Sequence, residues 1–337
     1  MRCPTIDQLP PPPSGKAGWP WTVDAPPDAG MDFSSLPRVT IVTPSYNQAE
    51  FIEETIRSIL LQGYPDLEYI VVDGGSNDGS VDVIRKYEPW LAWWVSEKDK
   101  GQSHAINKGF ARSSGQIFNY IASDDLLEPG CLLTVARAMQ KHHAKWVVGQ
   151  VRYRSAGHPD WPLTVKPETS FTEWFLWCPV PQPSSFWTAE LHRANGEFRE
   201  DLHYYFDYEF WLRLRFLKDQ MPAVIPQDLA VYRLHERSKT VSANPAFEIE
   251  GKQIRGSFMP LLTNMERVRL WFARRRFRAR KLGSRATRLL AQRRPLAAAG
   301  KVIAAMALWP PVALSFGDAK RVMARRGMTA PVVWGEE

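Results

Sequence analysis

The sequence predicts an α/β fold in which a mostly parallel sheet is flanked by helices, and three observations lead to this prediction. Short apolar segments rich in β-branched and aromatic residues are typical of strands, and four occur at residues 38–43, 67–72, 91–95 and 117–121. Helical patterns separate these segments, so the strands should lie parallel in one sheet. Polar clusters follow each strand, and the carboxyl ends of parallel strands share the edge where ligands bind.

The first strand is followed by a predicted helix that can cover one face of the sheet. Asn47 is the expected N-cap, and Glu50 three residues later completes a capping box. Apolar residues then recur at helical spacing up to Gly63, which is expected to end the helix. The polar residues 44–47 therefore lie at the end of the first strand, on the ligand-binding edge.

The next units repeat this order of strand, polar loop and helix. The second strand leads into residues 73–79, the third into residues 96–101 and the fourth into residues 123–125. Pro129 lies near the start of the following helix, where proline is tolerated. A fifth strand is predicted at residues 146–151.

Beyond residue 155 the regular alternation ends, because prolines break the chain into loops. Helical spacing returns at residues 206–217, a strand is predicted at 229–233, and the chain becomes mostly helical from about residue 246. We therefore expect a Pro-rich N-terminal lead-in, a main domain and a basic helical C-terminal extension, at residues 1–36, 37–245 and 246–337.

Composition and charge restrict the class of protein. Of the 337 residues, 44% are hydrophobic and 23% are charged, which is ordinary for a globular protein. Three cysteines without metal-type spacing favour a reduced, cytosolic protein, and the N-terminus has no apolar stretch typical of a signal peptide. The net charge of +7 is unevenly distributed: residues 1–266 hold 26 Lys+Arg and 33 Asp+Glu, whereas residues 267–337 hold 17 and 3.

The adjacent acids Asp124 and Asp125 are the strongest sign of a metal site. Two carboxylates at a buried strand end repel each other unless a cation or a base neutralises them. Oxygen ligands favour Mg²⁺ or Mn²⁺, which commonly bridge to substrate phosphates. Asp73 could accept hydrogen bonds from a nucleobase or ribose, or it could brace the loop that follows it. Glu97 and Asp99 could equally form ion pairs with nearby lysines.

Two common phosphate-binding motifs are absent from the sequence. No GxGxxG follows the first strand, and no Walker lysine motif occurs. A cation held by acids is therefore the expected neutraliser of phosphate charge. Nucleic-acid binding finds no support, since the body of the protein is acidic and no base-reading motif occurs.

Two stretches of the sequence closely resemble a known enzyme family. They read VTIVTPSYNQAEFIEETIRSILLQGYPDLEYIVVDGGSNDGS and SEKDKGQSHAINKGFARSSGQIFNYIASDD. The resemblance is to the family-2 glycosyltransferases, which are inverting enzymes with the Rossmann-like GT-A fold. It covers roughly residues 38–155, with weaker similarity at PVPQPSSFW, YFDYEFWLRL and YRLHERSKT. It implies that residues 37–155 bind a nucleotide-sugar and that residues 156–245 form the acceptor side.

The resemblance implies roles for the matching donor-binding positions. Asp73 resembles the acid that hydrogen-bonds the nucleotide base, and Pro44 and Tyr46 resemble the loop that lines the base and ribose. Lys108 is assigned to the nucleotide-sugar site with them, together with Asp124.

Ser123-Asp124-Asp125 resembles the metal-binding acidic motif of the family, although Ser replaces its first acid. The departure makes Asp125 the expected direct ligand of Mn²⁺ or Mg²⁺ and Asp124 a ribose-binding or water-mediated partner. His235 is similar to a histidine that approaches the metal or the diphosphate, and a surface or core histidine is the alternative.

Phe206-Asp207 aligns with a Glu-Asp pair whose aspartate is the usual catalytic base of the family. Phe replaces the Glu here, so Asp207 is the first candidate and Glu209 the reserve. Three polar side chains in a Pro-bounded loop could bind sugar hydroxyls or serve only the loop structure, namely Gln182, Ser184 and Ser185.

The implied function is transfer of a sugar from a UDP, dTDP or GDP donor to a glycan or polyprenyl-linked acceptor in surface polysaccharide synthesis. A sugar nucleotidyltransferase is one alternative, but it predicts a Gly-rich triphosphate loop where residues 44–47 stand. A non-catalytic glycan-binding relative is the other, and replacement of the Glu before Asp207 keeps it open.

The C-terminal extension predicts contact with an anionic membrane. Residues 267–294 hold 12 Lys+Arg and no acid, with aromatic and leucine side chains interspersed. The apolar stretch at residues 302–317 is too short to span a bilayer and is broken by Pro310-Pro311. We therefore expect a cytoplasmic protein that lies on the inner face of the cell membrane. A solvated charged helix is the alternative.

Overall fold

The chain divides into two compact units in the computed structural model, which describes residues 3–25, 35–166, 169–241 and 245–309. The first unit comprises Met1–Glu168 and Pro179–Gly251, and the second comprises Thr169–Cys178 and Lys252–Glu337. The sheet and all predicted site residues belong to the first unit. The predicted division at residues 36, 155 and 245 stays a prediction.

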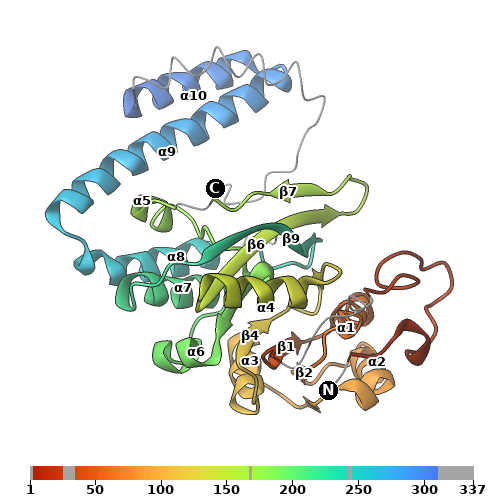
Figure 1. The fold of residues 1–337 in the computed structure, drawn as a ribbon. Coiled ribbons are helices and arrows are strands. Elements are labelled where there is room, and N and C mark those ends of the chain that lie inside the picture. The colour runs from red at the N-terminus through yellow and green to blue at the C-terminus, as the bar shows by residue number, and fades with distance from the viewer. Residues whose placement is uncertain (1–2, 26–34, 167–168, 242–244, 310–337) are drawn as a thin grey trace. The chain divides into compact units, whose positions relative to one another are not determined.

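Within the described residues, nine strands form one sheet in the order β3-β2-β1-β4-β8-β6-β9-β5, with β7 beside β6. The four strands predicted first are β1 (Val39–Ser45), β2 (Leu67–Asp73), β3 (Trp93–Ser96) and β4 (Ile117–Tyr120). β1 pairs in parallel with β2 and β4, and β2 pairs in parallel with β3. The predicted α/β fold with parallel strands is confirmed (Figure 1).

The other half of the sheet is mostly antiparallel. Its strands are β5 (Leu126–Leu127), β6 (Trp146–Ser155), β7 (Trp161–Leu163), β8 (Ser185–Thr188) and β9 (Ala223–Leu234). β8 is antiparallel to β4 and β6, and β5 to β9, whereas β6 and β9 are parallel. The sequence predicts β6 and β9 but not β8, because Pro181 and Pro183 make that segment resemble a loop.

Helices connect the strands at the places that the sequence predicts, except for two short helices at residues 171–174 and 189–195 that were not predicted. Those of the first unit are α1 (Ile52–Leu60), α2 (Ser80–Tyr87), α3 (Gln102–Ala111), α4 (Cys131–His142), α6 (Ala189–Asn195) and α7 (Phe206–Leu217). α8 (Pro245–Phe258) begins in the first unit and ends in the second. The second unit also contains α5 (Phe171–Trp174), α9 (Asn264–Ala291) and α10 (Pro295–Leu308). Single 3₁₀ turns lie at Ile6–Gln8, Glu88–Trp90, Gln182–Ser184 and Met259–Leu261.

The predicted capping box at the start of α1 is wrong. The helix begins at Ile52 with Phe51 as its N-cap, and Asn47 lies outside it with a left-handed φ of 52°. The Asn47 side chain instead accepts a hydrogen bond from the N–H of Asn77 at 3.0 Å. This hydrogen bond joins two loops at the ligand-binding edge. Asparagine is suited to the position because it tolerates a left-handed backbone better than most residues.

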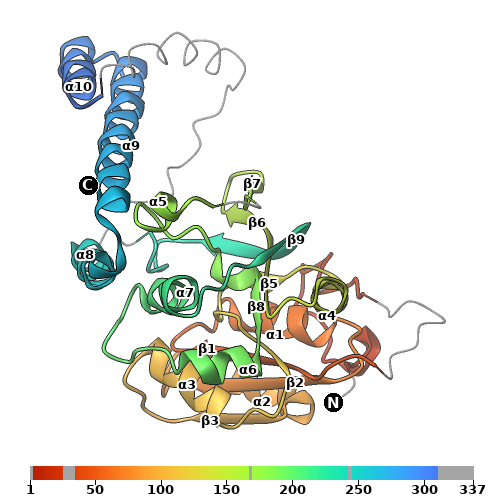
Figure 2. The same ribbon diagram turned by 60° about the vertical axis from the view of Figure 1, so that its left-hand side comes forward.

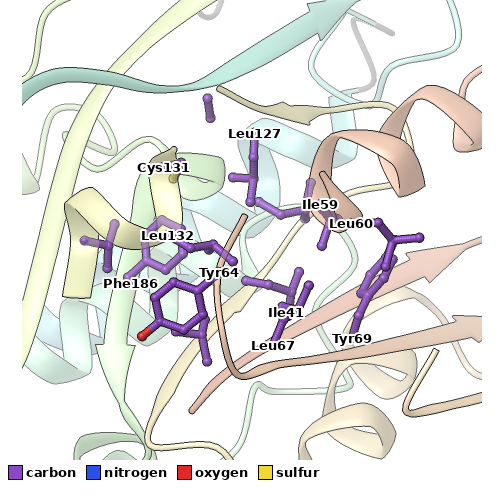
Figure 3. Close-up of a cluster of buried hydrophobic side chains, with 14 of the residues drawn as sticks. Ile41, Ile59, Leu60, Tyr64, Leu67, Tyr69, Leu127, Cys131, Leu132 and Phe186 are labelled. Atoms are coloured by element: carbon purple, nitrogen blue, oxygen red, sulfur yellow. The ribbon is translucent and has the colours of Figure 1, made fainter. Parts of the chain in front are cut away.

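Apolar packing on both faces holds the parallel strands in place. Figure 3 shows one face, where Ile41 and Tyr69 lie in the same buried cluster as Ile59 and Leu60 of α1. On the other face α3 approaches β1 so closely that a Cβ at Gly109 would lie 2.5 Å from Val42. Full burial of an aliphatic side chain contributes about 1.5–3 kcal/mol. These faces fix the strands and therefore the positions of the polar strand ends.

The N-terminal lead-in is held by one buried arginine of α1. Arg57 is fully buried, and its guanidinium donates to the carbonyls of Pro10 at 2.8 Å, Pro20 at 3.1 Å and Trp21 at 3.1 Å. The same guanidinium reaches the hydroxyl of Tyr87 at 3.2 Å. Residues 3–25 of the lead-in are thus part of the folded unit rather than a free tail.

Replacing Arg57 by methionine is expected to lower the free energy of unfolding by about 3 kcal/mol, because buried carbonyls lose charged donors. Urea denaturation would measure the loss, and limited proteolysis should cut residues 3–25 sooner. Arg85→Met is the matched control, since the Arg85 side chain is 61% exposed. Equal stability of the two variants would contradict the assigned role of Arg57.

α9 and α10 of the second unit pack side by side in both views (Figures 1 and 2). The two helices run antiparallel: Arg275, in the first half of α9, donates a hydrogen bond to the carbonyl of Leu308 at the end of α10. α9 is the basic, aromatic-bearing helix that the sequence predicts, whereas the predicted apolar stretch at 302–317 lies partly outside the described residues. Among the described helices, none has both the length and the apolar character to cross a bilayer.

Candidate functional site

The ends of the parallel strands bring the predicted polar residues to one edge of the sheet. Ser45 of β1 pairs with Asp73 of β2, and Asp73 pairs with Ser96 of β3. Residues 123–125 follow β4, which lies on the other side of β1. The predicted convergence of these strand ends on one edge is therefore confirmed.

Two loops at this edge are joined by hydrogen bonds and leave one aromatic ring exposed. The N–H of Asn47 donates to Ser76 Oγ at 2.7 Å, and the N–H of Gln48 donates to Ser80 Oγ at 2.9 Å. Pro44 is buried within β1, but Tyr46 is 63% exposed. An exposed ring on a fixed loop provides a surface on which a nucleobase can stack.

Asp73 is fully buried and braces the loop that follows β2. Its Oδ2 accepts hydrogen bonds from the N–H groups of Gly75 at 3.0 Å and Ser76 at 2.8 Å. The hydroxyl of Ser96 adds a third at 2.7 Å, and the hydroxyl of Ser76 reaches Oδ1 at 2.5 Å. The bracing role, one of the two interpretations open from the sequence, is therefore present. The nucleobase contact of Asp73 stays a prediction.

The third strand end places two acids differently. Asp99 accepts a hydrogen bond from the N–H of Gly101 at 2.8 Å and lies so close to Gly74 that a Cβ there would approach its Oδ2 to 2.7 Å. Glu97 forms an ion pair with Lys108 at 2.7 Å. Lys108, which was predicted to bind the donor, thus has a carboxylate partner in this structure, and its donor contact stays a prediction.

Asp124 and His235 face each other across the site. His235 Nε2 lies 3.0 Å from Asp124 Oδ2, and both side chains are mostly buried. The ring of Phe51 stacks on the imidazole with a centroid distance of 4.3 Å. Nδ1 is buried without a hydrogen-bond partner in the described residues. Packing on Phe51 therefore orients the imidazole, with Nε2 directed at the carboxylate.

Asp125 points away from that pair and into the protein. It is 3% exposed, and its Oδ1 accepts a hydrogen bond from the N–H of Arg233 at 2.9 Å. Burial, and then the neighbouring charge of Asp124, raise the pKa of Asp125 well above its usual range. Its predicted role as a direct metal ligand stays a prediction. In this structure, Asp124 rather than Asp125 faces His235.

Arg233 organises this part of the site and was not found from the sequence. It is 7% exposed, and its guanidinium donates to the carbonyls of Asp124 and Phe51 and to Thr55 Oγ1. It also pairs with Glu54 at 2.9 Å. Its signal was a charged residue within the apolar strand β9, two positions before His235. Arg233 thus fixes the backbone of the acidic loop against α1.

One carboxylate oxygen and one imidazole nitrogen have the spacing of two neighbouring ligands of an octahedral cation. Neighbouring ligands of an octahedral Mg²⁺, each about 2.1 Å from the metal, lie about 3 Å apart. Asp124 Oδ2 and His235 Nε2 have that separation, 3.0 Å. In the described part of the chain, no group of three or more His, Cys, Asp or Glu side chains is arranged to hold a metal. Two protein ligands would leave the other positions to phosphate oxygens and water, as Mg²⁺ sites commonly do.

Asp207 lies in the first turn of α7 and has the properties of a general base. Burial raises its pKa to about 6, opposed by the N–H of Tyr208, which donates to Oδ1 at 2.7 Å. The positive charge of Lys239 lowers this pKa, and the negative charge of Glu250 raises it. A carboxylate that titrates near neutral pH can accept a proton in the reaction and release it afterwards.

Lys239 lies between the Asp124–His235 pair and Asp207 in its charge interactions, and its role was not predicted from the sequence. Its Nζ donates to Gln102 Oε1 at 3.0 Å and to the carbonyl of His203 at 2.9 Å. Its charge interacts with Asp207 and with Asp124, so these two acids share one electrostatic neighbourhood. The only sequence signal was its position four residues after His235 in the segment YRLHERSKT.

Replacing Lys239 by methionine is expected to move the acid limb of the kcat–pH profile to higher pH. A carboxylate that serves as a general base works only when deprotonated, and without the lysine charge the pKa of Asp207 should rise above about 6. Lys218→Met, at an exposed lysine after α7, should leave the limb in place. A kcat that falls equally at every pH would contradict the electrostatic role.

Glu209, the reserve candidate for the base, is engaged in an ion pair. It is 4% exposed and contacts Arg213 at 3.0 Å within α7. Arg213 in turn donates to the carbonyls of Asn195 and Glu197. Glu209 therefore anchors α7 to the segment after α6, whereas Asp207 has no ion pair in the described residues. The catalytic assignment of Glu209 stays a prediction.

The polar side chains of the Pro-bounded loop at residues 182–185 form hydrogen bonds inside the protein and are not available to a sugar. Gln182, Ser184 and Ser185 are all buried. Gln182 donates to the carbonyl of Tyr120, Ser184 Oγ donates to the carbonyl of Gly149 at 2.8 Å, and Ser185 Oγ accepts from Trp146. The interpretation that these side chains bind sugar hydroxyls is wrong, because their hydrogen bonds are used within the core.

Curated relatives of the chain are glycosyltransferases. An uncharacterized glycosyltransferase of Mycobacterium tuberculosis is 38% identical over 93 residues, which are 27% of this chain and 36% of that protein. TuaG of Bacillus subtilis, named as a teichuronic acid biosynthesis glycosyltransferase, is 37% identical over 92 residues, or 26% of this chain and 36% of that protein. The matches thus span about a third of the length of these relatives.

Two solved structures share the fold, and a family model matches the sequence. TarS 1–349 of S. aureus in complex with UDP-GlcNAc has a TM-score of 0.52 at 16% identity, over 82% of this chain and 92% of that chain. The mannosyltransferase PcManGT of Pyrobaculum calidifontis in complex with GDP-Man and Mn²⁺ has a TM-score of 0.52 at 22% identity, over 88% and 83%. The model described as Glycosyl transferase family 2 matches residues 40–202. Residues 40–202 are therefore similar to family-2 glycosyltransferases, and the fold is of the predicted GT-A type.

Proposed function

We propose that the protein is an inverting, cation-dependent glycosyltransferase that moves a sugar from a nucleoside diphosphate to an acceptor hydroxyl. The observation that carries the proposal is that the charge of Lys239 interacts both with Asp124, which pairs with His235, and with the half-buried Asp207. Metal-ligand atoms and a base titrating near neutral pH are the two groups that this chemistry needs.

The donor is proposed to lie along the edge formed by the strand ends. Tyr46 offers an exposed ring for the base, and the loops at 44–49 and 73–80 are held together beneath it. TarS was solved with UDP-GlcNAc and PcManGT with GDP-Man and Mn²⁺, which supports a nucleotide-sugar donor of the UDP, dTDP or GDP type.

Asp124 and His235 are the proposed protein ligands of Mn²⁺ or Mg²⁺. The bound cation would stabilise negative charge on the departing diphosphate. Arg233 holds the main chain of Asp124, and Phe51 holds the plane of His235, so the two ligand atoms are fixed before the donor arrives. This fixation limits the reorganisation that binding requires.

Asp207 is the proposed base. Its carboxylate would accept the proton of the acceptor hydroxyl as that oxygen attacks the anomeric carbon from the face opposite the diphosphate. The anomeric configuration inverts as a result, and a positioned base typically contributes about 10²- to 10⁴-fold. The half-buried position at the start of α7 keeps its pKa near 6, so that most molecules are deprotonated at pH 7.

The acceptor is proposed to be a hydroxyl of a glycan or of a lipid-linked glycan in surface polysaccharide synthesis. The name of TuaG, which concerns teichuronic acid biosynthesis, supports this class. A non-catalytic glycan-binding protein is the second candidate, because Phe206 stands where the resemblance implies a Glu.

Release of nucleoside diphosphate from a panel of UDP-, dTDP- and GDP-sugars, with and without Mn²⁺, tests the proposal. We expect Mn²⁺-dependent release from one donor class, and its loss in Asp124→Ala. Asp82→Asn is the control, since Asp82 is an exposed acid of α2 whose side chain is 77% exposed. Thermal stabilisation by a nucleotide without release from any donor would favour the non-catalytic candidate.

A further inference from the structure

We propose that α9 and α10 form a hairpin that docks on an anionic lipid surface, with the outer face of α10 at the acyl boundary and the arginines of α9 at the phosphates. This lipid-docking hairpin comprises residues 264–308. This inference goes beyond glycosyl transfer and does not depend on the identity of the donor or the base.

The outer face of α10 is apolar and strongly exposed. Leu296 is 89% exposed, Ile303 68% and Met306 43%. These positions, together with Ala299, follow the spacing i, i+3, i+7 and i+10, which places them on one side of a helix. The exposed stripe thus contains four apolar side chains and no charge.

The inner face of α10 is held against α9 by small residues. Ala305 and Ala279 are fully buried, and Ala298 and Ala286 are each 1% exposed. Side chains of this size let two helices approach closely. Arg275 ties the end of α10 to α9, since it donates to the carbonyl of Leu308 at 3.0 Å. The hairpin is therefore a preformed element, and its apolar stripe faces away from α9.

Charge on α9 complements an anionic surface. Between residues 267 and 294 the chain holds 12 Lys+Arg and no acid. Seven of these arginines are exposed, namely Arg267, Arg269, Arg276, Arg278 and Arg280 of α9 and Arg293 and Arg294 just after it. A cluster of this kind beside an apolar stripe is the pattern of a peripheral, anionic-lipid-binding helix.

The dimensions of the hairpin agree with surface docking. The axes of packed helices lie about 8–10 Å apart, and an interfacial helix buries its apolar face about 5–10 Å into the headgroup boundary. With α10 at that depth, the arginines of α9 would lie at the level of the phosphates. α10 has 14 residues and is about 21 Å long, shorter than the hydrocarbon core of about 30 Å, so it should lie along the surface.

Co-sedimentation of the full chain with vesicles tests the proposal. Vesicles of phosphatidylcholine with phosphatidylglycerol should bind the protein, and vesicles of phosphatidylcholine alone should not. The triple change Leu296→Glu, Ile303→Glu and Met306→Glu should abolish binding. The double change Leu217→Glu and Met221→Glu is the matched control, because both residues are exposed apolar positions of the first unit, at 54% and 40%.

Neutralising three arginines of α9 measures the electrostatic contribution to vesicle binding. Arg276→Gln, Arg278→Gln and Arg280→Gln together should weaken binding to the anionic vesicles about 100-fold, because each arginine contributes about fivefold. Added salt should weaken binding of the unchanged protein in the same direction. Circular dichroism of each variant should show unchanged helix content, and nucleoside diphosphate release in solution should persist, so that this test is independent of the proposed catalysis.

Several outcomes would overturn the proposal. Unchanged sedimentation of the Leu296, Ile303 and Met306 variant would exclude docking by α10. Loss of binding on removal of residues 310–337, with the stripe variant still bound, would assign binding to that segment instead. Self-association that the stripe variant abolishes, or binding to an oligonucleotide without binding to vesicles, would identify a second copy or a nucleic acid as the partner.

Discussion

Asp207→Asn is expected to lower kcat for sugar transfer by about 10²- to 10⁴-fold, because asparagine cannot accept the proton of the acceptor hydroxyl. Donor binding should persist, since Asp207 is not one of the proposed cation ligands. Removal of a half-buried acid whose pKa is raised to about 6 should not destabilise the fold at neutral pH. Steady-state kinetics with saturating donor would measure the loss.

Glu209→Gln separates the base from its neighbour on the same helix. Glu209 pairs with Arg213, and loss of this buried pair should lower the melting temperature. At a temperature where the variant is still folded, kcat should stay close to that of the unchanged protein. If Glu209→Gln abolished turnover in the folded protein while Asp207→Asn left it intact, the assignment of the base would be reversed.

Asp124→Ala and His235→Ala have the second-largest expected effect. Each change removes one of two proposed protein ligands, so Mn²⁺ affinity in the presence of nucleoside diphosphate should fall by at least about 10- to 100-fold. Turnover should fall with it and should recover partly at high Mn²⁺ concentration, because weak binding can be offset by mass action. Isothermal titration with Mn²⁺ at fixed nucleoside diphosphate would give the affinities.

Asp125→Asn distinguishes the two adjacent acids. The Asp125 carboxylate accepts a hydrogen bond from the main chain of Arg233, and asparagine can retain that bond. We expect Asp125→Asn to keep most of the Mn²⁺ affinity of the unchanged protein. A loss as large as that of Asp124→Ala would instead make Asp125 the metal ligand, as the motif resemblance implies.

The sequence was sufficient for the parallel half of the fold. The segments that became β1, β2 and β4 are apolar enough to be recognised alone, and β1 and β2 fill both faces of the sheet with buried side chains. Because these strands are parallel, the polar residues at their carboxyl ends lie at the same edge of the sheet. β8 could not be predicted in the same way, because it is a short antiparallel strand whose partners, β4 and β6, are far away in the sequence.

The direction of individual site side chains could not be predicted either. Asp124 and Asp125 are neighbours in sequence, yet one faces His235 and the other faces the main chain of β9. The antiparallel pairing of Leu126 in β5 with Val231 in β9 sets this arrangement. Two residues back along the first strand and two forward along the second, Asp124 comes opposite Arg233. That register depends on a contact more than a hundred residues away along the chain, so no local pattern contains it.

The most direct test of the account is electron spin echo spectroscopy of Mn²⁺ bound together with a nucleoside diphosphate. If Asp124 and His235 hold the cation, the unchanged protein should show coupling of Mn²⁺ to an imidazole nitrogen, and the His235→Gln variant should bind Mn²⁺ more weakly and show none. The same nitrogen coupling in His235→Gln, or bound Mn²⁺ without nitrogen coupling in the unchanged protein, would contradict it.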